Sequence, residues 1–472
     1  GNAAGAQAEA LTAGSRVLHI TTQIDREFMD RDRAAIHDVP KQPEMLRGVS
    51  KAYFRIWDEK SAIGTLEAAI RAAMTPPTGP VSIEIPVDVQ RLAAFPAAPS
   101  NPPLPALPPV EEGKLDQLVA MIKAAKRPMI WLGGGARDAS AEATELVARG
   151  FGVVTSTQGR AIVAEATGAT LGAFNMTPEA RKVYAKSDLM IVVGSRLRGN
   201  ETLNNKMKLP SPLVQIDVDP TQSGRNYPID LFLCGDAAQS LRALLSRLPE
   251  TLDVDPQQNY EIAVARAQSE GVLRGRLGPY QTVADHLLAV VPTGSHPWVR
   301  DVTISNSTFG NRYVQIAAPH LGVHALGGGI GQGIAMAVGA AVASPDARTV
   351  ALLGDGGAML GIAELITAVD ENANITFVLM NDAAYGVIEN IQDVQYGGRR
   401  HYSALKTPNF AKLCDAIDLP HSKVTDITAF ADTFDAAMKV VGPSLVEVDM
   451  IAIGPFAESF AGPPAGAAGK LA

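Results

Sequence analysis

The sequence predicts an α/β protein that consists of three doubly wound parallel-sheet domains in series. Short apolar runs suited to strands that are buried on both faces recur along the chain, and in the third domain they are VRDVTIS, TVALLGD, TFVLMND and SLVEVDM. Helical stretches separate these runs, and this alternation is typical of a parallel sheet with crossover helices. At 472 residues the chain is also too long to fold around a single hydrophobic core.

Changes in composition along the chain predict the domain boundaries. Residues 1–94 contain a helix, the strand VLHIT, a second helix and the strand VSIEIPV, so the chain begins in the middle of a domain. Residues 95–111 are too rich in proline for helix or strand and are expected to form an extended linker. A central domain at 112–249, a connector at 250–279 and a third domain at 280–472 complete the predicted organisation.

The composition describes a mildly acidic globular protein. Hydrophobic residues make up 46% of the chain and the formal net charge is −8, which argues against a broad nucleic-acid surface. Glycine, proline or charged residues interrupt every long apolar run, so no segment is suited to span a membrane. Cys234 and Cys414 lack metal-ligand spacing, and we expect reduced thiols. Because the chain does not begin with a basic and apolar leader, we expect a cytoplasmic protein.

Two acidic residues are predicted to meet at one edge of the third sheet. LLGDGGAML, residues 352–360, reads as a strand, a glycine-rich turn and the start of a helix, which is typical of an anion-binding site. Asp355 nevertheless places a negative charge in this turn. Asp382, in MNDAAYG, follows the next predicted strand. Parallel strands end at the same edge of a sheet, where ligands bind in open α/β folds, so the two carboxylates are expected to face each other.

This pair of carboxylates indicates a site for a small divalent cation. Mg²⁺ favours one or two carboxylates together with the phosphate oxygens of a ligand. A GDG turn on its own is more often an ordinary turn whose aspartate caps a helix. The second aspartate at the end of a neighbouring strand favours the metal site over that interpretation.

The two turns resemble the signature of thiamine diphosphate (ThDP) enzymes, in which GDG is followed at a similar distance by Asn-Asn. The resemblance implies that Mg²⁺ is bound by Asp355, Asp382 and the main-chain carbonyl of Ala384. It also implies cofactor contacts by the glycines of the turn, Gly354, Gly356 and Gly357. Asp382 departs from the family pattern, in which Asn is commonest. An aspartate keeps an oxygen in the same place and adds negative charge, which favours cation binding.

HALGGGIGQGIAMAVGAAVA, residues 324–343, is similar to the glycine-rich turn before a helix in acetolactate-synthase-like ThDP enzymes. In those enzymes a bulky apolar residue pushes the two cofactor rings into a V, which brings the aminopyrimidine amino group close to the reactive thiazolium carbon. Ile330 matches this residue, and the carbonyl of Gly328 would accept a hydrogen bond from the amino group. Without the nearby GDG turn, Ile330 would be interpreted as an ordinary core residue.

Two further stretches complete the cofactor site that the resemblance implies. The short polar side chains of SNSTFGN can hold diphosphate oxygens without adding bulk, and they resemble a diphosphate-contacting loop of benzoylformate-decarboxylase-like relatives. The helix that opens at AAYGVIENIQD borders the reactive carbon in the family. The cofactor contacts implied are Asn306, Ser307, Thr308, Tyr385, Gly386 and Val387, and the acyl-group pocket is lined by Val387 and Ile388. The last two residues also suit the core face of an amphipathic helix.

The first domain matches the second half of the family's pyrimidine-binding domain, which packs on the third domain of a neighbouring subunit. The resemblance therefore implies a homodimer or homotetramer with active sites at the dimer interface. His37, in IHDVPKQ, is a candidate catalytic group, although a surface histidine fits the same pattern. The family's activating glutamate would lie upstream of Gly1 and is not present in this chain, so we expect a further segment to precede residue 1 in the full protein.

Glycine-rich turns in the central domain, at Gly133–Gly135 and Gly194, are similar to turns that bind a structural FAD in some relatives. The triplet lacks GxGxxG spacing, and many relatives keep such turns while binding nothing. The sequence thus disfavours FAD but leaves it as an alternative.

The resemblance covers nearly the whole chain and implies an enzyme of the acetolactate synthase or benzoylformate decarboxylase type with ThDP and Mg²⁺. The substrate would be a small 2-oxo acid or aldehyde. The implied reaction is decarboxylation to a cofactor-stabilised enamine, which then adds to a second carbonyl as in acetolactate synthase. Two alternatives remain: a simple 2-oxo-acid decarboxylase or aldehyde lyase, and a ThDP-fold protein with impaired catalysis.

Overall fold

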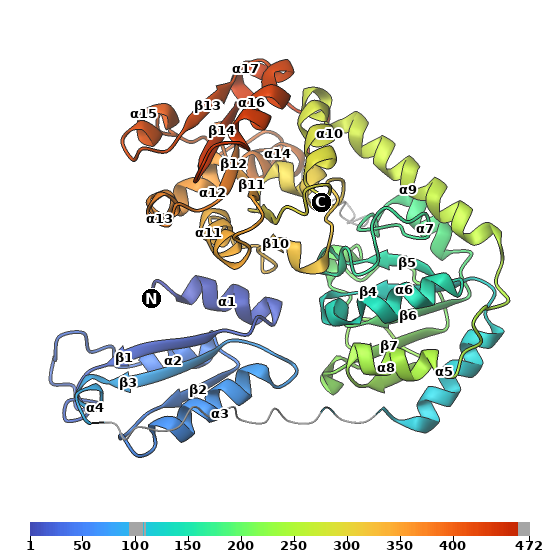
Figure 1. The fold of residues 1–472 in the computed structure, drawn as a ribbon, viewed down its shortest axis with the longest axis horizontal. Coiled ribbons are helices and arrows are strands. Elements are labelled where there is room, and N and C mark those ends of the chain that lie inside the picture. Colours follow the sequence, from blue (N-terminus) through green and yellow to red (C-terminus); the bar gives the residue numbers. More distant parts are fainter. Residues whose placement is uncertain (94–106, 108–109, 461–472) are drawn as a thin grey trace. The chain divides into compact units, whose positions relative to one another are not determined.

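The computed structural model of the protein describes residues 1–93, 107 and 110–460 (Figure 1). The chain falls into two compact units, Gly1–Pro108 with Leu326–Gly329, and Pro109–Ala325 with Ile330–Ala472. Most of the linker predicted at 95–111 lies outside the described residues. All three sheets of the described part are parallel, which confirms the predicted α/β fold class.

The first unit contains a three-stranded sheet with strand order β1-β3-β2. Its elements are α1 (Ala4–Ala13), β1 (Leu18–Gln23), α2 (Gln42–Gly48), β2 (Ala52–Arg55), α3 (Ala62–Met74), β3 (Val81–Pro86) and α4 (Val87–Gln90). Val81 and Ile83 of the central strand are fully buried and pack with Ala69 and Ala73 of α3. The small alanine side chains allow this helix to lie close to the sheet.

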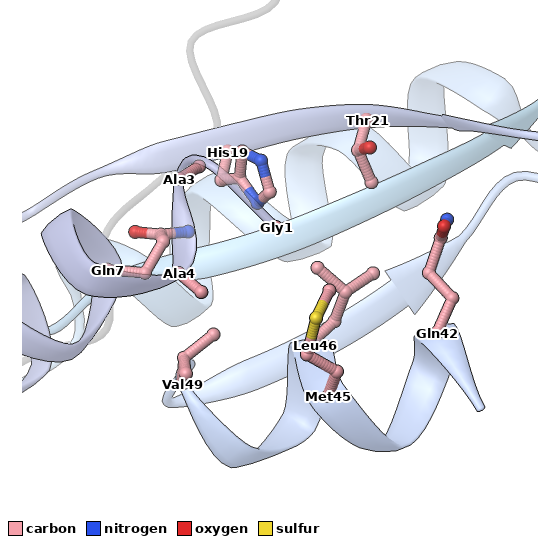
Figure 2. Close-up of a pocket in the computed structure, with 10 residues that line it drawn as sticks. All are labelled: Gly1, Ala3, Ala4, Gln7, His19, Thr21, Gln42, Met45, Leu46 and Val49. Atoms are coloured by element: carbon pink, nitrogen blue, oxygen red, sulfur yellow. The ribbon is translucent and has the colours of Figure 1, made fainter. Parts of the chain in front are cut away.

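A small pocket of the first unit is lined by residues of α1, β1 and α2 (Figure 2). Gln7 and His19 both contact the Ser82 hydroxyl: Nε2 of Gln7 donates to it at 3.4 Å, and Nδ1 of His19 lies 3.0 Å from it. The pocket measures about 60 Å³, whereas ordinary ligand pockets begin at about 300 Å³. We therefore assign no cofactor to it.

The second unit contains a five-stranded sheet formed by the central part of the chain, with strand order β5-β4-β6-β7-β8. Its strands are β4 (Pro128–Leu132), β5 (Gly152–Thr155), β6 (Leu189–Val193), β7 (Leu213–Asp217) and β8 (Leu231–Cys234). The α-helices are α5 (Glu112–Ala124), α6 (Ser140–Ala148), α7 (Pro178–Tyr184), α8 (Ala237–Leu245) and α9 (Gln257–Arg276). Short helical turns are η1 (Gly134–Ala139), η2 (Thr157–Gly159), η3 (Gly199–Glu201), η4 (Pro220–Gln222) and η5 (Gly278–Tyr280).

The same unit contains a six-stranded sheet with strand order β10-β9-β11-β12-β14-β13 (Figure 1). Its strands are β9 (Trp298–Arg300), β10 (Gly322–His324), β11 (Thr349–Gly354), β12 (Ile375–Asn381), β13 (His421–Val424) and β14 (Ser444–Asp449). Its longer helices are α10 (Gln281–Val290), α11 (Gly333–Ala343), α14 (Gly386–Tyr396) and α16 (Phe430–Ala437). The shorter elements are η6 (Asn306–Gly310), η7 (Pro319–Leu321), α12 (Asp355–Leu360), α13 (Glu364–Asp370), α15 (Phe410–Asp415), η8 (Ile427–Ala429) and α17 (Met450–Ile453).

Successive residues of the buried strands pack on opposite faces of the six-stranded sheet. Leu352 and Val378 belong to the core that α10 and α16 cover, whereas Leu353 and Leu379 belong to the core that α11 and α13 cover. Both faces are therefore apolar, as the continuous apolar runs predicted.

Strand lengths are where the structure differs from the sequence-based expectation. The run VRDVTI was predicted to be one strand, but β9 ends at Arg300 because the next free amide, that of Val302, donates to the carboxylate of Asp301 at 2.7 Å. Strands β2, β8, β10 and β13 were not predicted. Each lies at the edge of its sheet, where one side is not paired, and none has a long apolar run.

The described residues contain no helix that is long and apolar enough to cross a membrane. Both cysteines are free: Cys234 is half-buried and Cys414 is buried. Burial raises the pKa of the Cys414 thiol to about 11, so this thiol stays protonated at neutral pH.

A buried ion pair ties the central part of the second unit to the segment before β10. Arg160 donates two hydrogen bonds of 2.8 Å to the carboxylate of Glu165, and these side chains are only 1% and 6% exposed. Arg160 also donates to the carbonyl of Val314 at 2.5 Å, and Glu165 accepts from the amide of Ile316 at 2.9 Å. The pair therefore holds two distant stretches of sequence together.

Replacing Glu165 by Ala is expected to lower the free energy of unfolding by about 3–5 kcal/mol, because Arg160 would keep a buried charge without its partner. Denaturation with urea at neutral pH measures this loss. The control is Asp253→Ala, which breaks an exposed pair with Lys126 and should change stability by about 1 kcal/mol at most. Equal losses in the two variants would contradict the role of the buried pair.

Candidate active site

The carboxyl ends of β11 and β12 bring the two predicted metal-ligand turns together. The strands are parallel neighbours, with Gly354 opposite Met380. Asp355 follows β11 directly, and Asp382 follows β12 directly. Both turns therefore lie at the same edge of the sheet.

Asp355 is a buried carboxylate without a hydrogen-bond partner among the residues that the structure describes. It is 1% exposed, and neither Oδ1 nor Oδ2 accepts a hydrogen bond within the described residues. Gly354, not Asp355, is the N-cap of α12, and no side chain caps this helix. Asp355 therefore does not act as an ordinary helix N-cap. Leaving a buried carboxylate unpaired is costly, so the position requires a cation or a proton.

Asp382 shares this environment. Its Oδ1 accepts a hydrogen bond from the amide of Ala384 at 3.2 Å. Burial, and then the negative charge of Asp355, raise the pKa of Asp382, and burial raises the pKa of Asp355. Two carboxylates so close together in a poorly solvated place cannot both ionise unless a cation lies between them.

Asn381 fixes the turn that carries Asp382. Its Nδ2 donates to Oε1 of Glu447 on β14 at 2.9 Å, and its Oδ1 accepts from the amide of Ala383 at 3.3 Å. Ala383 has a left-handed backbone with φ of +51°, a conformation that costs about 1–3 kcal/mol for a residue other than glycine and is often found at functional sites. Asn381 is the first residue of the Asn-Asp pair in MNDAAYG, but neither Asn381 nor Glu447 was predicted as a site residue.

The donors present fit Mg²⁺. An antiparallel bridge joins Ala384 to Ala404, but its hydrogen bonds are made by the flanking amides of Tyr385 and Leu405, so they do not engage the Ala384 carbonyl. The described residues contain no group of three or more His, Cys, Asp or Glu side chains that could hold a metal. A cation here would complete its shell with main-chain and ligand oxygens, which is the arrangement Mg²⁺ favours.

Each glycine of the GDGG turn is required by a side chain that approaches it. A Cβ atom at Gly354 would lie 2.6 Å from the hydroxyl oxygen of Thr303, and one at Gly356 would lie 2.7 Å from the ring of Tyr385. A Cβ at Gly357 would lie 2.6 Å from a carboxylate oxygen of Asp301. Thr303 and Asp301 were not predicted as site residues. Both residues lie inside the run VRDVTI, which was predicted to be a strand, so no pattern in the sequence marked them.

The glycine-rich turn before α11 has two residues in the left-handed region, Gly328 at φ +87° and Gly331 at φ +85°. Ile330 lies between them and is 37% exposed. Ile334 and Ala337, further along α11, are buried in the core. The turn therefore leaves the Ile330 side chain accessible, as a contact to a ligand requires, while the helix itself is anchored.

The predicted diphosphate contacts lie in the π-helical turn η6, which begins six residues after β9 ends. Asn306 is 3% exposed, and within residues 1–93, 107 and 110–460 its Oδ1 has no hydrogen-bond partner. The Thr308 hydroxyl donates to the carbonyls of Ile304 and Ser305, and Ser307 is half-buried. The loops after β9 and β11 flank the point where the strand order reverses, the usual ligand-binding position in such sheets.

The start of α14 adds apolar side chains close to the metal-ligand turn. A Cβ at Gly386 would clash with Oδ2 of Asp382, so a side chain there would displace this carboxylate. Val387 is half-buried and packs against the core on the α10 side of the sheet, whereas Ile388 is 46% exposed. Of the two predicted pocket residues, Ile388 is therefore the one that is free to contact a ligand.

The remaining predicted residues lie elsewhere. His37 is exposed on a loop of the first unit, between β1 and α2, with φ of +69°. In the central sheet, the turns after β4 and β6 pack directly on each other: a Cβ at Gly133 would lie 2.3 Å from the carbonyl oxygen of Gly194, and Gly135 donates to this oxygen at 2.9 Å. The close packing of these two turns is sufficient to explain why glycines occupy positions 133 and 194, so their presence is not evidence for an FAD site.

Comparison with known proteins defines the family. Sequence models of thiamine pyrophosphate enzymes match two stretches of the chain, the C-terminal TPP binding domain at residues 303–448 and the central domain at residues 115–244. Together they cover more than half of the chain, and the first contains both aspartates. The chain belongs to the thiamine pyrophosphate (thiamine diphosphate) enzyme family, as its motifs predicted.

Individual relatives agree with this assignment. The chain is 25% identical over 473 residues to the chloroplastic acetolactate synthase of Arabidopsis thaliana, which covers 93% of this chain and 69% of the relative. It is 25% identical over 409 residues to a protein named as an acetolactate synthase large subunit of Methanococcus aeolicus, covering 80% and 68%. A solved structure from Mycobacterium smegmatis, assigned as a thiamin diphosphate-dependent enzyme, has the same fold, with a TM-score of 0.77 at 20% identity over 95% of this chain and 85% of that one.

The pH dependence of stability tests the aspartate pair in the absence of divalent cations. The pKa of Asp382 is raised to about 8, so the folded state favours its protonated form. The fold then loses stability as the pH rises from about 4 to about 8, by up to about 1.4 kcal/mol per pH unit. Asp382→Asn cannot ionise and should be more stable than the parent protein at pH 8, with a smaller loss between pH 5 and pH 8. Urea denaturation with a chelator present measures both.

The control for this prediction is the same series with Mg²⁺, which binds the ionised pair and should restore the parent protein's stability at pH 8. If Asp382→Asn keeps the parent protein's full pH dependence, the two carboxyl groups do not interact as described.

Proposed function

We propose that this protein is a ThDP- and Mg²⁺-dependent enzyme that decarboxylates a 2-oxo acid and joins the remaining acyl unit to a second carbonyl. The observation that carries the proposal is the buried pair of Asp355 and Asp382. The oxygens of Asp355 have no hydrogen-bond partner in the described part of the chain, and a cation between the carboxylates and a diphosphate would satisfy them. The acetolactate synthases among the relatives support carboligation as the overall reaction.

The chain's own residues would hold and orient the cofactor. Asp355, Asp382 and the carbonyl of Ala384 would bind Mg²⁺, whose role is to anchor the diphosphate and not to act on the substrate. The unpartnered Oδ1 of Asn306 marks this side chain as available for a further polar contact. When bound, ThDP supplies the electron sink that stabilises the carbanion left by departing CO₂.

Apolar residues would shape the reacting part of the site. The accessible side chain of Ile330 would support the cofactor rings, and the carbonyl of Gly328 would accept a hydrogen bond from the cofactor. Ile388, with Val387 behind it, would line the acyl pocket and keep water away from the reacting carbon. In a homodimer or homotetramer, His37 of a neighbouring subunit is the candidate for an additional polar group.

Product analysis tests the reaction directly. The full-length protein is incubated with ThDP, Mg²⁺ and a panel of 2-oxo acids, and NMR follows CO₂ and acyloin formation. Acyloins support carboligation. Release of aldehyde alone indicates a simple decarboxylase, and CO₂ release from none of the acids would show a ThDP-fold protein with impaired catalysis.

Asp355→Ala is expected to weaken Mg²⁺-dependent binding of ThDP by roughly 100-fold or more, because it removes a ligand of the metal. Even the loss of a residue that only orients a metal ligand weakens metal binding by about 10- to 100-fold. Isothermal titration calorimetry measures the affinity. Asp382→Asn is the matched variant: it keeps an oxygen at the ligand position and should retain most of the affinity. Unchanged ThDP binding by Asp355→Ala would overturn the metal-site assignment.

Ile388→Phe is expected to change the preference between small and large carbonyl substrates by roughly 10- to 200-fold in kcat/KM. The Kd for ThDP should stay within a factor of about two of the parent value, since Ile388 lies on α14 and is not one of the proposed metal ligands. Ile388 is preferable to Val387, where a larger side chain would strain the core. Val394→Phe is the control, because Val394 is 70% exposed on the same helix. Equal losses for all substrates would contradict the pocket role.

A further inference from the structure

Asp301 is a buried acidic residue that none of the roles above uses. It follows β9 directly, and it is fully buried, with 0% exposure. Its backbone amide donates to the carbonyl of Leu352 on β11 at 2.9 Å. This bond places Asp301 at the carboxyl edge of the sheet, among the turns that carry the predicted cofactor contacts.

The carboxylate of Asp301 caps the helix that follows the glycine-rich turn. Both of its oxygens accept a hydrogen bond from the amide of Gly331 at 3.1 Å. Burial raises the pKa of Asp301, whereas the nearby amides of Gly331, Gln332 and Gly333 act to lower it, so these amides favour the ionised carboxylate. Helix α11 begins at Gly333, and the side chain of its N-cap residue, Gln332, makes no capping bond. Asp301 thus provides, from another strand, the negative charge that a helix N-terminus favours.

The same carboxylate lies against the GDGG turn. A Cβ at Gly357 would lie 2.6 Å from Oδ2 of Asp301, and a Cβ at Gly333 would lie 2.7 Å from the Cβ of Asp301. Neither position can carry a side chain while Asp301 remains in place. One side chain therefore contacts both the turn that follows Ile330 and the turn that begins at Asp355.

We propose that Asp301 is a positioning residue of the cofactor site, which holds the glycine-rich turn against the GDGG turn and thereby sets the position of Ile330 relative to the metal ligand Asp355. Asp301 acts through Gly331 and Gly357 and touches neither metal nor substrate. Its effect on the cofactor rests on the proposed ThDP function, whereas the link between the two turns is a property of the protein alone.

Amide hydrogen exchange of the cofactor-free, full-length protein tests this link. The backbone amides of residues 331–333 should exchange slowly in the parent protein and roughly tenfold or more faster in Asp301→Asn. The reason is that the asparagine side chain offers one acceptor oxygen, whereas the aspartate carboxylate offers two. Glu165→Gln is the matched control, because it alters another buried carboxylate of the same unit and should lower stability without affecting these amides. Fast exchange of residues 331–333 in the parent protein, or an equal rate in both Asp301 forms, would overturn the proposal.

A second measurement separates positioning from a merely structural role. With ThDP and Mg²⁺ at saturation, NMR follows exchange of the thiazolium C2 proton with D₂O, normalised to bound cofactor. Asp301→Asn should slow this exchange by roughly 10- to 100-fold, and Glu165→Gln should not change it. An unchanged rate in Asp301→Asn would overturn the positioning role even if the variant were less stable. Failure of the parent protein to bind ThDP would reject the proposed function, while amide exchange would still decide the link between the turns.

Gly357→Ala provides an independent variant that leaves the charge of Asp301 intact. The added methyl group would displace the carboxylate, so the amides of residues 331–333 should again lose protection. If Asp301→Asn does not fold, this variant decides the question, and full protection of those amides in folded Gly357→Ala would overturn the proposal.

Discussion

The mutual repulsion of two buried carboxylates is the constraint on which the rest of the site depends. Asp355 and Asp382 lie where neither can ionise freely beside the other, because burial raises both pKa values. In the proposed function, a divalent cation would remove this conflict and would bring an anionic ligand to the same place. The acid in this glycine-rich turn, which is puzzling in the sequence, is therefore explained by the proposed function, in which the turn would hold a diphosphate through a metal.

The parallel sheet supplies the geometry that makes this pair. Neighbouring strands β11 and β12 end in register, so the residues that follow them face one another, and the glycines of the GDGG turn admit Thr303, Tyr385 and Asp301 at distances that no side chain would allow. Asn381 and Glu447 hold the second turn in a conformation that is strained at Ala383. The rigid sheet thus offsets the free-energy cost of burying two carboxylates and of the strained backbone at Ala383.

Residues close in sequence to a recognisable motif were predictable, and residues that reach the site from elsewhere were not. The glycine-rich turn and the pair of Asp355 and Asp382 were predictable because glycine turns and aspartates directly after apolar strands are typical of phosphate and Mg²⁺ sites. Asp301 carries no such pattern: its role arises from the amide of Gly331 and from Gly357, which lie 30 and 56 residues away in sequence. Strands β2, β8, β10 and β13 were not predicted for a related reason, since their pairing partners decide their structure.

The sequence by itself determined the fold class, the family and the two aspartates, because strand periodicity, glycine turns and the separation of the acids are local properties. Only the tertiary structure decided how those parts act on each other. It showed that Asp355 is buried without a partner, that Ile388 and not Val387 is exposed, and that the glycines at 133 and 194 serve to pack two turns together. Burial and contact depend on the packing of distant segments, and no local pattern contains that information.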